Sequence, residues 1–118
     1  MEIFVVCWDK ERAASLHASL EAKGWDVRGE SDDGRQAYNT IKGWQPALVV
    51  LDLNLRSSHS TAVAHSLAKT RATRDIPLVF VTDDTAQVRM LSARFEDADF
   101  VTADRLAEFI DDEYEIVD

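Results

Sequence analysis

The stretch Pro46–Asn54, PALVVLDLN, constrains the fold more than any other part of the sequence. Five apolar residues in succession, Ala47 to Leu51, lead directly to the carboxylate of Asp52. A short and continuous apolar run is typical of a strand that is buried on both faces, as in the middle of a parallel sheet. An Asp at the carboxyl end of such a strand reaches the edge where open α/β sheets place their ligand sites. The stretch therefore predicts a central strand that ends at a candidate site.

The pattern along the chain predicts five strands that alternate with five helices. We expect the strands to centre on Ile3–Val6, Trp25–Glu30, Ala47–Asp52, Leu78–Val81 and Phe100–Val101. We expect helices over about residues 10–23, 35–42, 61–70, 85–95 and 105–113, and a polar loop over Arg56–Ser60. This alternation predicts a parallel sheet with helices on both faces. Five strands suit a flavodoxin-like α/β fold of strand order 2-1-3-4-5, formed as one domain over residues 1–118.

Composition and charge limit the classes of partner. The chain of 118 residues is 46% apolar and 30% charged, which predicts a soluble globular domain. Its formal net charge of −9 argues against nucleic acid or an anionic membrane surface as a direct partner, and favours proteins or small cationic ligands. The single cysteine, Cys7, excludes an internal disulfide framework and fits the reducing cytoplasm. The start of the chain lacks a signal-peptide pattern, and no stretch is long enough to cross a membrane.

Four strand ends bring polar residues to one edge of the predicted sheet. They are Cys7-Trp8-Asp9, Asp52, Thr82-Asp83 and Thr102-Ala103. The ordered set PALVVLDLNL, DIPLVFVTDD and DADFVTADRLAEFI, together with the helical stretch DDGRQAYNTIKGWQP, resembles the CheY-like receiver domain of two-component response regulators. The resemblance covers nearly the whole chain.

The resemblance implies a role for several residues at this edge. Asp52 matches the position that accepts a phosphoryl group from a histidine kinase, a reaction that needs Mg²⁺ to neutralise charge. In the family, an acidic pair after the first strand, the phosphoacceptor and a backbone carbonyl, here that of Asn54, hold the ion. Thr82 matches a hydroxyl that contacts the phosphoryl group, and Phe100 matches an aromatic residue that reports the switch.

The sequence departs from the family pattern at the groups that perform the chemistry. Cys7 and Trp8 stand in the place of the acidic pair, and Asp9 comes one residue late. Ala103 stands where a lysine is expected, and no lysine occurs after Lys69. Loss of one charge-stabilising group can already slow a reaction by about a hundredfold. The sequence therefore predicts a degenerate, or pseudo-, receiver that is not an enzyme, needs no cofactor and acts in signalling through protein contacts.

Two alternatives remain open at this stage. One is a working receiver that is phosphorylated at Asp52, with a divalent cation such as Mg²⁺ held by Asp9, Asp52 and Asn54. The other is a small-molecule-sensing module that uses the same pocket. Asp9, Asp52 and Asp83 are close together in such a fold with no lysine beside them, so a cation or separation must relieve their repulsion. We favour separation, with Asp9 and Asp83 as helix caps and Trp8 covering Asp52.

The resemblance also implies a contact surface. In working receivers the face made by the fourth helix, the fifth strand and the last helix forms dimers and output contacts. We expect the same face here, for a homodimer, a histidine kinase or an output protein, with candidate residues Arg89, Arg94, Phe100, Arg105 and Phe109. Trp8, Trp25 and Trp44 are expected to be partly exposed packing residues, and Cys7 a buried, inert thiol.

Overall fold

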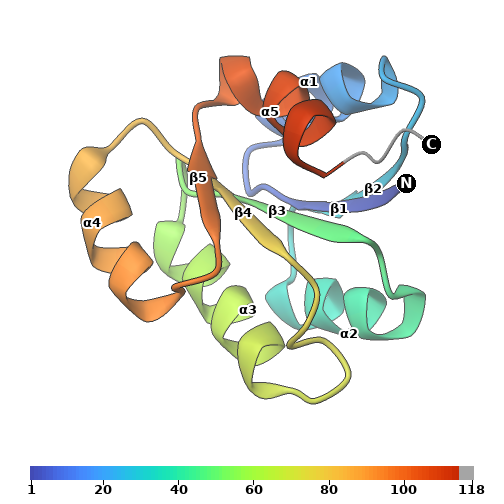
Figure 1. Ribbon diagram of the computed structural model, residues 1–118. Helices are drawn as coiled ribbons and strands as arrows, with labels where there is room; N and C mark the ends of the chain where they lie inside the picture. Colours follow the sequence, from blue (N-terminus) through green and yellow to red (C-terminus); the bar gives the residue numbers. More distant parts are fainter. Residues whose placement is uncertain (115–118) are drawn as a thin grey trace.

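The computed structural model describes residues 1–114, in which five parallel strands form one sheet between helices (Figure 1). The last four residues of the predicted domain, 115–118, lie outside the described residues. The strands are β1 (Glu2–Val6), β2 (Asp26–Glu30), β3 (Leu48–Asp52), β4 (Leu78–Val81) and β5 (Asp99–Val101). The helices are α1 (Lys10–Glu21), α2 (Gly34–Trp44), α3 (Ser57–Lys69), α4 (Thr85–Arg94), the 3₁₀ turn η1 (Ala103–Arg105) and α5 (Leu106–Glu113). Among the helices of residues 1–114, none combines the length and apolar composition needed to cross a bilayer.

The strand order is β2-β1-β3-β4-β5, and every pair is parallel, which confirms the predicted fold class. Each predicted strand is present within one residue of its expected limits. β2 begins at Asp26 and β3 at Leu48, because Trp25 and Ala47 precede the first ladder pairs of those strands. Since all strands run the same way, Val6, Asp52, Val81 and Val101 end at a common edge of the sheet.

Side chains alternate across the three middle strands and supply two separate cores. α1 and α5 cover one face of the sheet, and α2 and α3 cover the other (Figure 1). In β3, Leu48 and Val50 belong to the core under α1 and α5, whereas Val49 and Leu51 belong to the core under α2 and α3. Leu91 and Phe95, at the end of α4, join that second core. Because strand residues alternate between faces, Asp52 lies on the same face as Leu48 and Val50, the face covered by α1 and α5.

Aspartates begin three of the helices. Asp9, Asp33 and Asp84 each accept hydrogen bonds from two backbone N–H groups in the first turn of α1, α2 and α4 respectively. An N-cap of this kind stabilises a helix by about 1 kcal/mol, because those N–H groups have no partner within the helix. Asp83, which the sequence predicted as a cap, does not cap α4; the next residue does.

Two other local predictions were wrong. The segment Arg56–Ser60 is not a loop, since α3 begins at Ser57 after Arg56 adopts a left-handed backbone with φ of 52°. Trp8 and Trp25 are buried, with 7% and 5% of their surface exposed, whereas Trp44 is half-buried as expected. The polar residues after Arg56 suggested an exposed loop. One of them, Ser60, instead faces inward and forms its hydrogen bonds inside the protein.

Candidate functional site

Asp52 is the last residue of β3, and none of its side-chain surface is exposed. It follows Leu51 of one core and Val50 of the other, so the alternation along β3 directs its carboxylate toward the α1 side of the sheet. A buried carboxylate is stable only when a cation or hydrogen bonds compensate it. The residues that surround Asp52 therefore decide what this site can do.

Arg12, in the first turn of α1, provides the compensating charge. Its Nε donates a hydrogen bond of 2.9 Å to Oδ2 of Asp52. The Arg12 side chain is 29% exposed, so the guanidinium closes the site from the solvent side. The sequence analysis noted that no lysine lies beside Asp52, but it did not consider an arginine from α1, and Arg12 supplies that charge. A basic residue in the first turn of a helix opposes the helix dipole, and this was the available signal that Arg12 has a partner.

Cys7 lies directly after β1 and also contacts the carboxylate. Its Sγ lies 3.5 Å from Oδ2 of Asp52 and 3.4 Å from the backbone oxygen of Asp9. Burial is the main cause that raises the pKa of the Cys7 thiol to about 11, and the negative charge of Asp52 raises it further. The thiol is therefore protonated at neutral pH and donates to Asp52, as an inert cysteine would.

The Trp8 side chain lies on the opposite face of the sheet from the Asp52 carboxylate, in the core under α2 and α3. Its Nε1 donates a hydrogen bond of 2.8 Å to Oγ of Ser60, and that hydroxyl donates one of 2.8 Å to the backbone oxygen of Asp52. The prediction that Trp8 covers the carboxylate was wrong, since adjacent residues after a strand alternate in direction. Trp8 instead fixes the backbone of Asp52 through Ser60, a residue that the sequence analysis did not select.

The three acidic residues predicted to converge at this edge are engaged differently. Asp9 uses its carboxylate to cap α1, as expected. Asp83 is exposed at the rim, and neither residue makes a hydrogen bond with Asp52 within residues 1–114. The predicted separation of the charges is thus present, but Arg12 also neutralises Asp52.

An open hollow of about 440 Å³ lies beside Arg12 at this edge, between the ends of β3, β4 and β5. Asn54, Thr82 and Ala103 line it, together with the rim carboxylates of Asp83, Asp84 and Asp104. The Thr82 hydroxyl lies 2.5 Å from Oε1 of Gln87 and accepts a hydrogen bond of 3.0 Å from the backbone N–H of Asp84. Its hydrogen bonds therefore go to the start of α4.

Phe100 is half-buried on β5 and lies beside Phe80 of the neighbouring strand. The two rings stack with their centroids 5.2 Å apart and an angle of 14° between their planes. The ring is therefore held against the core under α2 and α3, with which it packs.

The residues at the predicted metal position do not fit Mg²⁺. That ion prefers carboxylate and carbonyl oxygens, whereas a thiol and an indole stand after β1, and Oδ2 of Asp52 is paired with Arg12. Within residues 1–114, no group of three or more His, Cys, Asp or Glu side chains has the geometry to hold a metal ion. Oδ1 of Asp52 is buried and makes no hydrogen bond in this part of the chain. The site is thus built around an ion pair and not around a cation site.

Comparison with solved structures agrees with the fold. The receiver domain of a response regulator from Bermanella marisrubri superposes with a TM-score of 0.76 at 23% sequence identity, covering 97% of this chain and 98% of that one. The bacteriophytochrome response regulator RtBRR has a TM-score of 0.79 at 20% identity, with coverage of 99% and 80%. The Mn²⁺-bound form of response regulator Rcp1 has a TM-score of 0.73 at 16% identity, with coverage of 99% and 96%. No model of a known protein family matches the sequence, and no curated protein sequence matches it.

These comparisons confirm the receiver-type fold that the sequence resemblance predicted. At identities of 16% to 23%, the likeness concerns the fold and not the chemistry of the site.

Proposed function

We propose that this chain is an atypical receiver module that acts in signal transduction through protein contacts, without Mg²⁺-dependent phosphorylation of Asp52. It is a regulatory protein and not an enzyme. The observation that carries the proposal is the ion pair between Nε of Arg12 and Oδ2 of Asp52 at 2.9 Å. The pair gives the buried carboxylate a permanent counter-charge that belongs to the protein itself.

The energetics of the pair support the proposal. Removal of one partner from a buried ion pair costs about 3–5 kcal/mol, because the remaining charge is left uncompensated. A metal ion or phosphodonor that reached Oδ2 of Asp52 would have to displace Arg12 and compensate that cost, and Oδ1 is buried away from solvent. The rim of the hollow carries Asp83, Asp84 and Asp104, which repel an anionic phosphodonor. Phosphorylation of Asp52 is therefore opposed both by the occupied carboxylate and by the field around it.

We further propose that α4, β5 and α5 form the contact surface with a partner protein or a second copy. Arg89, Arg94 and Arg105 are exposed there, and Phe100 and Phe109 are half-buried. Met90 of α4 has 57% of its surface exposed and is one of two exposed large apolar side chains within residues 1–114, the other being Leu55 at 45%. An exposed apolar residue among charges is a typical component of a protein interface.

A phosphorylation assay separates this function from the working receiver. The protein is incubated with Mg²⁺ and a small phosphodonor, and its intact mass is measured for the wild type, Arg12→Ala and Asp52→Asn. We expect no phosphoryl adduct on the wild type, since the ion pair persists in Mg²⁺ at millimolar concentration. A stoichiometric adduct on the wild type that Asp52→Asn abolishes would establish the working receiver instead. An adduct on Arg12→Ala alone would identify Arg12 as the group that prevents the reaction.

A further inference from the structure

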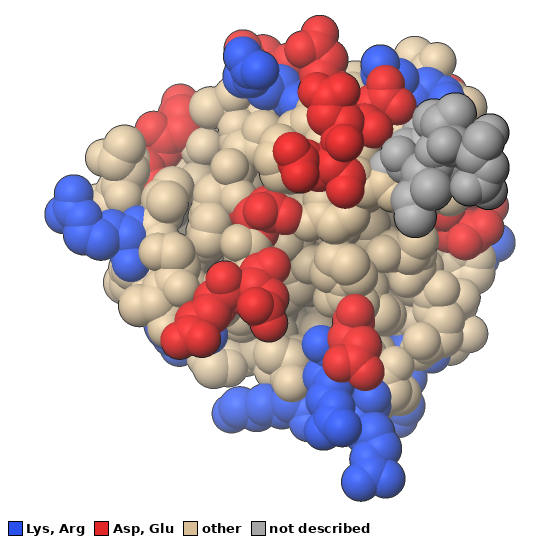
Figure 2. Space-filling view, in the orientation of Figure 1, with Lys and Arg blue, Asp and Glu red and all other residues tan. Residues whose placement is uncertain are grey.

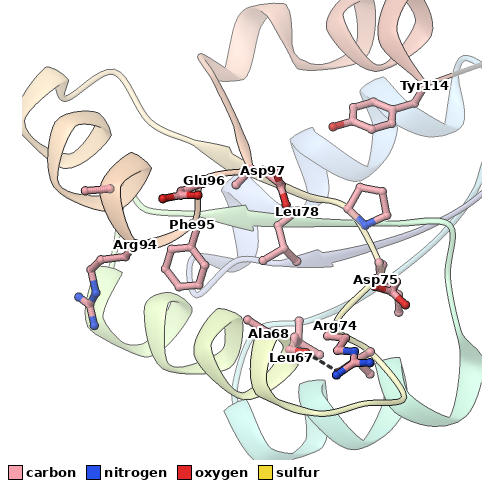
Figure 3. Close-up of a pocket in the computed structure, with 15 residues that line it drawn as sticks. Leu67, Ala68, Arg74, Asp75, Leu78, Arg94, Phe95, Glu96, Asp97 and Tyr114 are labelled. Atoms are coloured by element: carbon pink, nitrogen blue, oxygen red, sulfur yellow. Dashed lines mark hydrogen bonds between the residues drawn. The ribbon is translucent and has the colours of Figure 1, made fainter.

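A second hollow lies far from Asp52, at the opposite edge of the sheet. It has a volume of about 650 Å³ and is formed where β4 and β5 begin, between the ends of α3 and α4 (Figure 3). Since parallel strands place Asp52 at their carboxyl ends, the ion pair that carries the proposed function lies away from this groove, although Arg94 of the proposed contact surface lies at its rim.

The floor of the groove is apolar. Leu78 at the start of β4, Leu67 of α3 and Phe95 after α4 form its centre and are buried, and the half-buried Ile76, Pro77 and Ala98 supply its accessible apolar surface. In Figure 3 the Phe95 ring and the Leu78 side chain lie next to each other in the middle of this floor. A cavity of this size accommodates a ligand or a large side chain of a partner, and apolar floors of this kind supply most of the affinity in protein contacts.

The rim beside this floor is acidic. Glu96 and Asp97 follow α4, and Asp75 precedes β4 on the other side of the groove; all three are exposed. No ion pair joins any of these carboxylates to a lysine or arginine within residues 1–114. Figure 2 shows acidic side chains spread over this face, with the largest group of basic side chains at its lower end and others at its top and left edges.

Arg74 and Arg94 also line the groove, but within residues 1–114 neither forms an ion pair with these carboxylates. Arg94 extends away from Phe95 toward α3 in Figure 3, and its Nη2 lies 2.7 Å from Nε2 of His65. Arg74 lies at the lower end of the groove, on the side of the α3–β4 connection. Glu96 and Asp97 are thus left to face a partner, and the net charge of −9 favours the approach of a basic segment.

We propose that this groove binds a segment of a partner protein that inserts a large apolar side chain against Leu78 and Phe95 and places Lys or Arg beside Glu96 and Asp97. The apolar side chain covers the half-buried Ile76, Pro77 and Ala98, and the basic residues compensate the unpaired carboxylates of the rim. This inference goes beyond the proposed function and does not depend on it, because the groove is separate from Asp52 and can bind whether or not Asp52 is phosphorylated.

Selection of phage-displayed random peptides against the full-length protein tests the inference. We expect the selected peptides to share one large apolar residue with Lys or Arg next to it. Binding is then measured on three variants. Ala98→Trp fills the groove, and the double variant Glu96→Lys/Asp97→Lys reverses the charge of its rim. The double variant Glu21→Lys/Asp26→Lys makes the same change of charge at exposed positions of α1 and β2 and serves as the control.

We expect affinity to fall at least tenfold for the two groove variants and to stay unchanged for the control. Circular dichroism of each variant checks that it is folded. If Ala98→Trp does not fold, the Glu96→Lys/Asp97→Lys variant alone tests the inference, because Glu96 and Asp97 are exposed and their replacement leaves the core unchanged. The inference is wrong if selection yields no binders, if the binders lack basic residues, or if they bind the groove variants as tightly as the wild type. An equal loss in the control would show that the attraction comes from net charge and not from this groove.

Discussion

The guanidinium of Arg12 and the carboxylate of Asp52 lie in direct contact, with Nε and Oδ2 separated by 2.9 Å, at the edge of the sheet where β3 ends. Asp52 is fully buried, and 29% of the Arg12 side chain reaches solvent. The pair connects α1 to the central strand and places a positive charge beside the only phosphoacceptor position implied by the family resemblance. The stability of the protein and the chemistry of the site therefore depend on the same contact.

Replacement of Arg12 by alanine is expected to lower the free energy of unfolding by about 3 kcal/mol, because Asp52 is then charged, buried and unpaired. Asp52→Asn should cost only about 1 kcal/mol, since the amide oxygen can still accept a hydrogen bond from Arg12. The Arg12→Ala loss should be smaller in the Asp52→Asn background, with a coupling energy of about 1–2 kcal/mol. Urea denaturation of the wild type, the two single variants and the double variant measures these values.

Arg35→Ala provides the matched control, since Arg35 is exposed on α2 and no ion pair joins it to an acidic residue in the described part of the chain. We expect its effect to be below about 0.5 kcal/mol. Equal losses from Arg12→Ala in both backgrounds would mean that the arginine acts through packing and not through its charge on Asp52.

The hydrogen bonds from Trp8 through Ser60 to the backbone of Asp52 give a second prediction. Ser60→Ala removes the hydroxyl that joins them and leaves both the indole N–H and the Asp52 carbonyl without this partner. An unsatisfied buried polar group costs about 1–3 kcal/mol, so we expect a loss in this range in urea denaturation. Ser58→Ala is the control, because Ser58 is exposed in the same helix. If both variants unfold at the same urea concentration, this hydrogen-bonded chain does not stabilise the strand end.

The fold could be predicted from the sequence because its main determinants are local. The run Ala47–Leu51 has no polar residue, which predicted a strand covered on both faces, and Leu48–Leu51 are fully buried in β3. Aspartates placed directly before apolar-periodic stretches marked the starts of helices, as Asp9 does for α1. The start of α3 was missed because Ser60 is satisfied by Trp8 and Asp52, and these contacts are distant in the sequence.

The candidate site could be predicted only in part, for a related reason. The position of Asp52 at the end of β3 follows from its sequence neighbours, whereas the identity of its partner depends on how α1 lies over the sheet. Arg12 is separated from Asp52 by 40 positions, and the direction of its side chain is fixed by tertiary packing. The sequence therefore showed that the usual metal ligands and the lysine are absent. It did not show that Arg12 pairs with Asp52.

Tyr114, at the end of α5, should titrate abnormally. Burial is the main cause that raises its pKa, and its hydroxyl also donates a hydrogen bond to the Asp99 carboxylate, which raises the pKa further. We expect Asp99→Asn to lower the pKa of Tyr114, because the negative charge that opposes the phenolate is removed. Absorbance titration of the phenolate in a Tyr38→Phe background measures Tyr114 alone, since the chain contains two tyrosines. If Asp99→Asn does not change the pKa of Tyr114, burial alone raises that pKa.

The last prediction concerns the thiol of Cys7 and the stability of the protein in alkaline solution. Burial, with the charge of Asp52, raises the pKa of Cys7 from 9.0 to about 11. Between these two values the unfolded chain loses the thiol proton while the folded protein keeps it, so the free energy of unfolding must fall as pH rises. Cys7→Ala removes this contribution. The difference in free energy of unfolding between wild type and Cys7→Ala should therefore be constant below about pH 8 and shrink or change sign as pH rises from 9 toward 11.

Urea denaturation at a series of pH values tests this, with both proteins carrying Tyr114→Phe so that the second alkaline group does not contribute. The same thiol should resist alkylation at pH 8 in the folded protein and react once urea unfolds the chain, because the thiolate is the reactive form and burial suppresses it. A pH-independent difference between the two proteins, together with rapid alkylation of the folded protein, would mean that Cys7 is ionised beside Asp52. In that case Arg12 would have to compensate two negative charges, and the account of the site as a single neutral ion pair would be wrong.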